Sequence, residues 1–531
     1  MSASIPADSG PGGRSAAAPA IAGPDKAHLE TANRPLLMGA VILVSICQFL
    51  DATIANVALP HMQAALGAST DSISWVLTSF IVATAIATPL SGWLSDRIGS
   101  RNLFIGATLV FLGASAACGA ATSLAEMVVF RTLQGTASAF IGTLTITTMF
   151  DVSPPSKHAM TMGIFSMIVM VAPISGPFIG GVITEYLNWR WIFYVNLPIG
   201  IPAVIVLWWL LPSRPITQRP LDGFGFVAIG LSLASLQLML DRGQHKDWFN
   251  SPEIVIELII AISAMWVFVL HSLQTPRPLF NRALYRDRNY VIGLAFMAVM
   301  SFSSVGLSAT LPMMFQTIYG YSVIDSGLMM APRGIGAMIS SLLTGYLARY
   351  VDARIIMSSG YLLAAAGLWS MTYWSLDMNT QPILWAAFLQ GFGFGFIVTP
   401  MNVLALAMLP PALRPDGSSL SGLFRNLGGS VGVSIFVSML ARGQQSSHAA
   451  LAAEVSAGVV PGIDLPGLVD RLPGLGGGAI AIINAEVSRQ ATMISFLDSF
   501  HVLSWMLVAF APLPFLVQRP EVFGNSLAGR K

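Results

Sequence analysis

Long apolar stretches separated by short polar breaks occupy the chain from residue 36 to residue 518. Each holds about 18 to 25 residues, the length that a helix needs to cross the hydrocarbon core of a bilayer. Residues 1–35 are instead rich in Ala, Pro, Gly and Ser and predict a disordered tail. The pattern predicts fourteen membrane spans, near residues 36–58, 73–94, 102–121, 124–148, 159–183, 191–212, 222–240, 253–270, 290–315, 327–347, 355–374, 382–407, 418–440 and 500–518.

The two halves of this series repeat each other. Leu133–Gly135 recurs as Leu389–Gly391, and Pro154–Pro155 recurs as Pro410–Pro411, both at an offset of 256 residues. Each pair falls at the matching span of its half, which indicates a duplicated bundle of six spans with two extra spans between the copies. The predicted fold class is therefore an all-α polytopic membrane protein. Its expected parts are a disordered cytoplasmic tail (1–35), a six-helix bundle (36–212), two linker helices with a cytoplasmic loop (213–289), a second six-helix bundle (290–518) containing a long loop (441–499), and a cytoplasmic tail (519–531).

Lys and Arg gather on one side of the predicted membrane. With both termini placed in the cytoplasm, the inner segments hold eighteen of these residues and the outer segments hold six. Because basic residues are enriched in cytoplasmic loops, this split predicts a multi-pass inner-membrane protein with both ends inside the cell. The long segment 441–499 then falls on the outer, periplasmic side.

The composition agrees with a membrane protein and excludes several classes of function. Charged residues are 10% of the 531 residues, against about 25% in soluble domains, and the mean hydropathy is +0.70. The net charge is only +2 and no dense basic run occurs, so we expect no nucleic-acid partner. The sequence has no ATP-binding loop, its histidines show no metal-ligand spacing, and Cys47 and Cys118 lie in apolar runs. We therefore expect neither an enzyme nor a metal site.

Asp51 in the first span and Arg131 in the fourth are charges inside the membrane. Such a charge is costly unless it is paired or faces water. Each lies about seven residues, hence roughly 10 Å, from the outer end of its span, so the two charges match in depth. An acid beside a cation stays ionised, whereas a desolvated acid without one holds its proton. We therefore expect a proton-coupling pair, and a static pair that only positions the helices is the alternative.

The loop after the second span contains a second motif. Residues 92–102 read Gly-Trp-Leu-Ser-Asp-Arg-Ile-Gly-Ser-Arg-Asn. The glycines permit a tight turn, and Asp96 can pair with basic side chains or a helix N-terminus and hold neighbouring helix ends together. An ordinary basic loop is the alternative. The candidate gating residues in this loop are Gly92, Asp96, Arg97, Gly99 and Arg101.

The fifth span carries a third motif, Gly-Pro-Phe-Ile-Gly-Gly, at residues 176–181. Gly176 and Gly180 form a face of small residues that permits close contact between helices, with Gly181 beside it. Pro177 removes a backbone donor and bends the helix. We expect these four residues to take part in conformational change, and generic helix packing is the alternative.

These motifs together resemble the major facilitator superfamily. The pattern G-x-L-x-D-R-x-G-x-R at 92–101 is the signature loop of that superfamily, and Gly-Pro-x-x-Gly-Gly at 176–181 marks its exporters that exchange substrate for protons. With the Asp51 segment, the aromatic stretch 188–200 and fourteen spans, the chain is similar to the EmrB/QacA branch of drug:proton antiporters. The resemblance covers residues 36–518.

The resemblance implies the major facilitator fold, alternating access, and proton-driven export of amphipathic or hydrophobic small molecules such as drugs. It implies no cofactor, with the proton gradient as the energy source, and membrane lipid around the protein. Transfer of cargo to a periplasmic adaptor and an outer-membrane channel is an open expectation. A dedicated exporter of one metabolite, lipid or siderophore is the main alternative, and a non-transporting receptor or membrane enzyme is a remote one.

A central cavity is expected between spans 1, 2, 4 and 5 and their counterparts 9, 10, 12 and 13. Aromatic walls accommodate varied apolar shapes because the contact is poorly directional. Any one of the candidates can instead be packed or lipid-facing. The expected substrate-binding residues are Asn56, Trp75, Gln134, Phe165, Phe315, Gln316, Phe392, Phe394 and Phe424.

The long outer segment 441–499 has two different parts. Pro and Gly recur between residues 461 and 478, and we expect that they prevent a helix there. Residues 479–493 have the periodicity of an amphipathic helix that lies on the membrane or against a partner. A mobile linker is the alternative.

Overall fold

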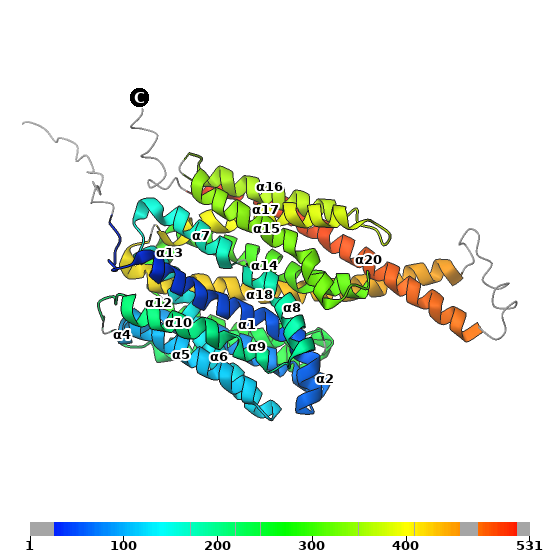
Figure 1. The fold of residues 1–531 in the computed structure, drawn as a ribbon, viewed down its shortest axis with the longest axis horizontal. Helices are drawn as coiled ribbons and strands as arrows, with labels where there is room; N and C mark the ends of the chain where they lie inside the picture. Colours follow the sequence, from blue (N-terminus) through cyan, green and yellow to red (C-terminus); the bar gives the residue numbers. More distant parts are fainter. Residues whose placement is uncertain are drawn as a thin grey trace, which may run out of the picture.

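The helices of the protein run side by side in two groups (Figure 1). The computed structural model describes residues 26–517 except 170, 218, 245, 349, 408 and 457–475. Within that part of the chain, all regular secondary structure is helical. The first helix begins and the last one ends at the same end of the molecule, which we call the tail end, and the opposite end is the far end.

The first group packs around α6, which contacts α1, α3 and α5. Local signals in the sequence fix where these helices begin. The Asn33 side chain accepts a hydrogen bond from the Leu36 N–H at the start of α1, and Ser123 caps α6 in the same way. The group comprises α1 (Arg34–Leu66), α2 (Thr70–Ile73), α3 (Trp75–Ala87), α4 (Ser91–Ile98), α5 (Ser100–Ala120), α6 (Leu124–Asp151), α7 (His158–Val169), α8 (Val171–Tyr186), α9 (Trp191–Tyr194) and α10 (Asn196–Leu210).

Glycines permit close helix contacts in the second group, among them the contact between α14 and α18. A Cβ atom added at Gly428 or Gly432 would lie 2.2 Å from a backbone oxygen of α14, so only glycine permits this approach. The second group comprises α14 (Arg288–Thr317), α15 (Val323–Leu347), α16 (Ala353–Met371), α17 (Thr380–Asn402), α18 (Arg414–Ser456) and α20 (Gly476–Phe510).

Two helices between the groups pack against each other: α11 (Gly223–Arg242) and α12 (Pro252–Gln274). The first of them also contacts α3 of the first group and α18 of the second. Ser434 on α18 donates a hydrogen bond to the Leu240 carbonyl at 2.9 Å. The linker helix α11 thus touches both groups. A short helix, α13 (Ala283–Arg286), precedes α14.

Ten helices of the described chain are long and apolar enough to cross a membrane, so this is a multi-pass membrane protein. The four expected spans outside this set are the fourth, fifth, tenth and eleventh, which correspond to α6, α7 with α8, α15 and α16. Two of these helices carry interior arginines, Arg131 on α6 and Arg333 on α15. Polar residues that face the protein lower the mean hydropathy of a helix without facing lipid.

The first span is longer than the sequence predicts. It was expected to end near residue 58, before Pro60, but α1 continues through Pro60 to Leu66. Proline removes one backbone donor and bends a helix without always ending it. The helix ends instead at Gly67, which has a φ of 62° and whose N–H bonds to the Gln63 carbonyl. Residues 1–25 of the expected tail lie outside the described residues.

The expected loop 441–499 is helical in its described parts, which confirms the helix expected at 479–493 and corrects the loop expected at 441–456. Helix α18 continues to Ser456, and α20 begins at Gly476, inside the Gly-rich run, so the expected amphipathic segment 479–493 belongs to a long helix. The two helices protrude together beyond the others at the far end (Figure 1). The Ser495 hydroxyl donates to the Leu440 carbonyl at 2.9 Å, which ties them where they leave the bundle. Residues 457–475, with Pro461, Gly462, Pro466, Gly467, Pro473 and Gly474, lie outside the described residues.

Candidate functional site: a buried ion pair in the first helix group

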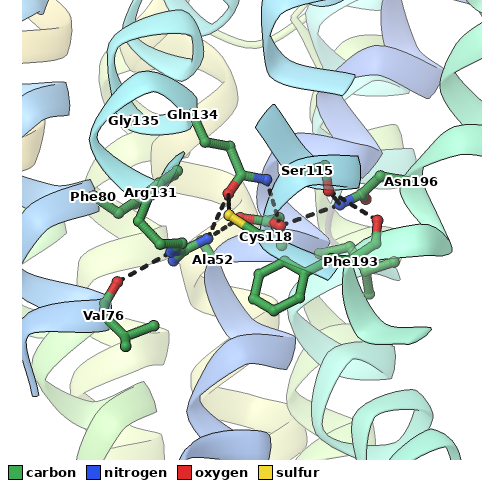
Figure 2. A network of polar contacts seen from close by, with 12 residues as sticks. Ala52, Val76, Phe80, Ser115, Cys118, Arg131, Gln134, Gly135, Phe193 and Asn196 are labelled. Atoms are coloured by element: carbon green, nitrogen blue, oxygen red, sulfur yellow. Dashed lines mark hydrogen bonds and ion pairs between the residues drawn. The ribbon is translucent and has the colours of Figure 1, made fainter. Parts of the chain in front are cut away.

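Asp51 lies at the centre of a buried network of polar side chains. Its partners Arg131, Gln134 and Asn196 are labelled in Figure 2. Its Oδ2 is 2.7 Å from Nη1 of Arg131. Its Oδ1 accepts hydrogen bonds from Gln134 Nε2 at 2.8 Å and from Asn196 Nδ2 at 3.1 Å. Arg131 also donates to Gln134 Oε1 at 2.9 Å, which closes a triangle of contacts. The four side chains come from α1, α6 and α10, and none is more than 1% exposed.

Further contacts hold this network in place. Arg131 Nε donates to the Val76 carbonyl on α3 at 3.0 Å, and its guanidinium lies 4.4 Å from the centre of the Phe80 ring. Asn196 Nδ2 also lies 3.0 Å from the Ser115 hydroxyl on α5. Five helices therefore fix the position of one carboxylate, so a displacement of any of them changes its contacts.

The sequence prediction of an Asp51–Arg131 pair is confirmed, and its role in proton coupling stays a prediction. The pair follows from the helices: α1 and α6 run in opposite directions, and each brings its charge to the same depth. Leaving one partner of a buried ion pair alone costs about 3–5 kcal/mol. Removal of either side chain would therefore leave an isolated buried charge at this site.

The glycine motif of α8 packs directly on this part of α1. A Cβ atom at Gly176 would lie 2.2 Å from Thr53 Oγ1, and one at Gly180 would lie 2.9 Å from Ile54 Cγ1. The expected close helix contact is confirmed, and it falls within three residues of Asp51. Gly181 is buried on the same helix, and Pro177 lies in α8 with a side chain outside the described ones.

An ionic latch joins the two helix groups at the tail end. Arg219, in the linker before α11, contacts Asp416 of α18 at 2.6 Å and Asp96 of α4 at 3.4 Å. Burial alone would lower the pKa of Arg219, but the two carboxylates, Asp416 above all, raise it above its usual value. A Cβ atom at Gly92 would lie 2.3 Å from Asp416 Oδ1, so glycine is required where α4 meets α18. The expected pairing of Asp96 is therefore confirmed.

A second set of charges also joins the two helix groups at the tail end. Asp151, at the end of α6, contacts Arg214 at 2.5 Å and Arg414 of α18 at 3.3 Å. Beyond these charges, the Ser418 hydroxyl donates to the Thr143 carbonyl at 2.7 Å. In this structure the two groups are thus held together at the tail end by ion pairs and buried hydrogen bonds.

The remaining residues of the signature loop have different positions. Gly99 has a φ of 86° and forms the tight turn between α4 and α5, as its sequence predicts. Arg101 donates to the Trp208 carbonyl of α10, and Arg97 is exposed.

The expected substrate-binding residues do not form one set. Two of them are interior packing or network residues: Gln134 belongs to the Asp51 network, and Phe315 is packed against Trp374 and is 1% exposed. Phe165 is also buried. Trp75 is exposed and lies under Arg242 at the far end. Of the others, Asn56 and Gln316 are exposed, and Phe392, Phe394 and Phe424 are half-buried.

Sequence reasoning missed several residues of the site. Asn196 appeared only as part of an aromatic stretch, although an amide inside an apolar span signals a buried polar contact. Arg219, Asp416 and Asp151 lie in short loops or at helix ends, where a charged residue is common and gives no signal of its own. Their pairing depends on which loops the fold brings together.

Two packed helix groups, the first of which encloses a buried acid–arginine pair, in a chain with ten long apolar helices define a membrane transport protein rather than an enzyme. The comparisons with known proteins identify the family. The family model of the Major Facilitator Superfamily matches residues 41–433, and the chain belongs to this superfamily.

Relatives and solved structures agree with this assignment. The multidrug export protein EmrB of Escherichia coli (strain K12) is 33% identical over 94% of this chain and 98% of its own length. The fatty acid resistance protein FarB of Neisseria gonorrhoeae is 31% identical over 91% of this chain and 96% of its own. Among solved structures, the human organic anion transporter MFSD10 (TETRAN) matches with a TM-score of 0.58 at 14% identity, covering 89% of this chain and 99% of that one. This last likeness shows the fold alone.

Proposed function

We propose that this protein is a proton-coupled efflux transporter that exports amphipathic or hydrophobic small molecules by alternating access. The observation that carries the proposal is the buried Asp51–Arg131 pair inside a fold shared with transporters. The relatives named multidrug export proteins support drug-like cargo, and the relative named for fatty acid resistance supports amphipathic cargo.

The proton step follows from the chemistry of the pair. A proton taken up by Asp51 neutralises the acid and weakens its attraction to Arg131, and release of the proton restores the ion pair. Because α1, α3, α5, α6 and α10 all contact the network, the change of charge alters how these helices pack. Uptake of the proton from one side and release to the other drives cargo in the opposite direction.

The tail-end latch fits one state of this cycle. With Arg219 bound to Asp416 and Asp96, the two groups are closed at the end that we assign to the cytoplasm. Opening requires these pairs to break, and Gly176 and Gly180 then let α8 slide on α1.

The finer topology belongs to the same proposal. We assign fourteen spans in an inner membrane, with 36–212 and 290–518 as the two bundles, 213–289 as the linker region, and both termini in the cytoplasm. The protruding ends of α18 and α20 then lie in the periplasm, where an adaptor and an outer-membrane channel can receive cargo. The excess of Lys and Arg in the inner segments supports this orientation.

The direct test is a resistance and accumulation screen in a host that lacks its own efflux pumps. Cells that express the protein should accumulate less of several amphipathic drugs than empty-vector cells, and an agent that collapses the proton gradient should abolish the difference. Equal accumulation for all compounds would refute export. A difference that persists without the gradient would refute proton coupling.

A further inference from the structure

Membrane helices contain three interior arginines: Arg131, Arg333 and Arg425. They differ in the groups that contact the charged guanidinium. Arg131 has the carboxylate of Asp51. Among the described residues, Arg333 on α15 has only neutral partners: its Nε donates to Gln390 Oε1 at 2.7 Å, and its Nη1 donates to the Ser308 hydroxyl at 2.6 Å. Both side chains are held by hydrogen bonds on several sides and have a fixed place in the bundle.

Arg425 on α18 has no such partners. Within the described part of the chain it makes no hydrogen bond and no ion pair, and α18 carries no acidic residue between Asp416 and Glu454. It lies eleven residues after Arg414, the first residue of α18, which is about 16 Å along the helix and near the middle of a bilayer core about 30 Å thick. An unpaired charge at this depth is expensive, so it points to a ligand.

The neighbours of Arg425 on its helix show where its side chain lies. Ser418 and Gly422 fall on the same face of α18, seven and three residues earlier. Ser418 bonds to the Thr143 carbonyl, and a Cβ atom at Gly422 would touch Thr88, so this face meets the first helix group. Arg425 therefore lies between the two groups and does not face lipid.

The exposure of α18 changes at this level. Every residue from Arg414 to Leu423 is buried, whereas Phe424, Arg425, Asn426 and Leu427 are all half-buried. The side chains of α18 are therefore less tightly enclosed from the level of Phe424 and Arg425 onward. Arg425 thus lies where the burial of α18 falls, and the half-buried Phe424 is its neighbour in sequence.

We propose that Arg425 binds the anionic head group of the exported cargo, so that this transporter accepts amphipathic oxyanions such as carboxylates or sulfonates. A guanidinium suits this role because its fork of N–H donors matches two oxygens of a carboxylate. The apolar part of such a cargo then lies toward the half-buried phenylalanines. The inference rests on the proposed function, and it names the class of cargo that this same pathway carries.

The test compares two cargo molecules with the same alkyl tail and opposite charge, dodecanoate and dodecyltrimethylammonium. Proton-driven transport is measured in vesicles of phosphatidylcholine, whose zwitterionic head group does not compete as a net anion. The variants are Arg425→Gln, Arg425→Lys and the matched control Arg442→Gln, which removes an exposed arginine further along α18. Heat stability with and without dodecanoate reports binding independently of transport.

The expected result is that Arg425→Gln lowers the preference for dodecanoate over dodecyltrimethylammonium at least tenfold, as for a lost charge-assisted hydrogen bond. Arg425→Lys should recover part of the preference, Arg442→Gln should not change it, and dodecanoate should stabilise the wild type but not Arg425→Gln. An unchanged preference in a folded Arg425→Gln protein would overturn the inference. A wild type that carries only the cation would also overturn the inference about Arg425, but it would agree with the proposed function. A wild type that moves neither cargo contradicts the proposed function, and the stability measurement still decides whether Arg425 binds the anion.

Discussion

Replacement of Gly176 by alanine tests whether the contact of α8 with α1 controls the proton site. The new Cβ atom would lie 2.2 Å from Thr53 Oγ1 and 2.9 Å from Thr53 Cβ. Carbon atoms normally approach to about 3.5–4.0 Å, so the two helices must separate by about 1 Å or Thr53 must change its position. The Thr53 hydroxyl is held by hydrogen bonds to the Phe49 and Leu50 carbonyls, which resists that change.

The size of the effect follows from this geometry. Overpacking of one methyl group in a tight interior costs about 1–3 kcal/mol. Because Thr53 lies two residues from Asp51, the displacement also moves the carboxylate relative to Arg131. We expect Gly176→Ala to insert and fold with a lowered unfolding temperature, and to lose most of its proton-driven transport.

The measurement is proton-driven efflux in inverted vesicles, normalised to the amount of folded protein, together with thermal unfolding of the purified variant. Gly106→Ala is the matched control, because an added Cβ atom there meets no atom within 4 Å, and it should transport like the wild type. Thr53→Ala in the Gly176→Ala background should restore part of the activity. Wild-type transport and stability in Gly176→Ala would refute the reasoning.

Three further predictions concern other parts of the molecule. Asn196→Ala removes a hydrogen bond to the Asp51 carboxylate and should lower the unfolding free energy by about 1.5–3 kcal/mol, measured by denaturant titration; an unchanged value would contradict the network. Arg219→Gln leaves Asp416 unpaired, so a cysteine at the buried Ser418 should react faster with a thiol reagent; equal rates would show that the latch does not hold the tail end closed. A cysteine at the exposed Gln445, in a background without native cysteines, should react with an impermeant reagent added outside the cell, and labelling only from the inside would reverse the topology.

The sequence alone predicts those features of the site that depend on how deep a residue lies in the membrane. Counting residues from the ends of two spans was enough to pair Asp51 with Arg131. The same counting could not show which side of α6 faces inward, so Gln134 was expected in the cavity although it hydrogen-bonds to Asp51. A membrane span has apolar residues on all sides, so its hydrophobic pattern does not reveal the face that packs.

Helix ends were less predictable for a related reason. The sequence predicts that the first span ends before Pro60, but a proline is tolerated when the helix around it is packed. The segment 441–456 contains several alanines, which favour a helix, yet its polar residues indicated a loop. The helix persists there because α18 and α20 pack on each other beyond the bundle, a contact between segments far apart in the sequence.

Proton release by Asp51→Asn protein tests the central claim most directly. Purified protein is reconstituted in lipid vesicles with a pH-sensitive dye inside, and the pH change on addition of a transported drug is recorded. Exchange of labelled for unlabelled drug is measured in parallel, because it needs no proton. Asp377→Asn, which removes an exposed acid, is the matched control. The account predicts that Asp51→Asn exchanges drug but moves no protons, while the wild type and Asp377→Asn do both. Drug-dependent proton movement by a folded Asp51→Asn protein would contradict it.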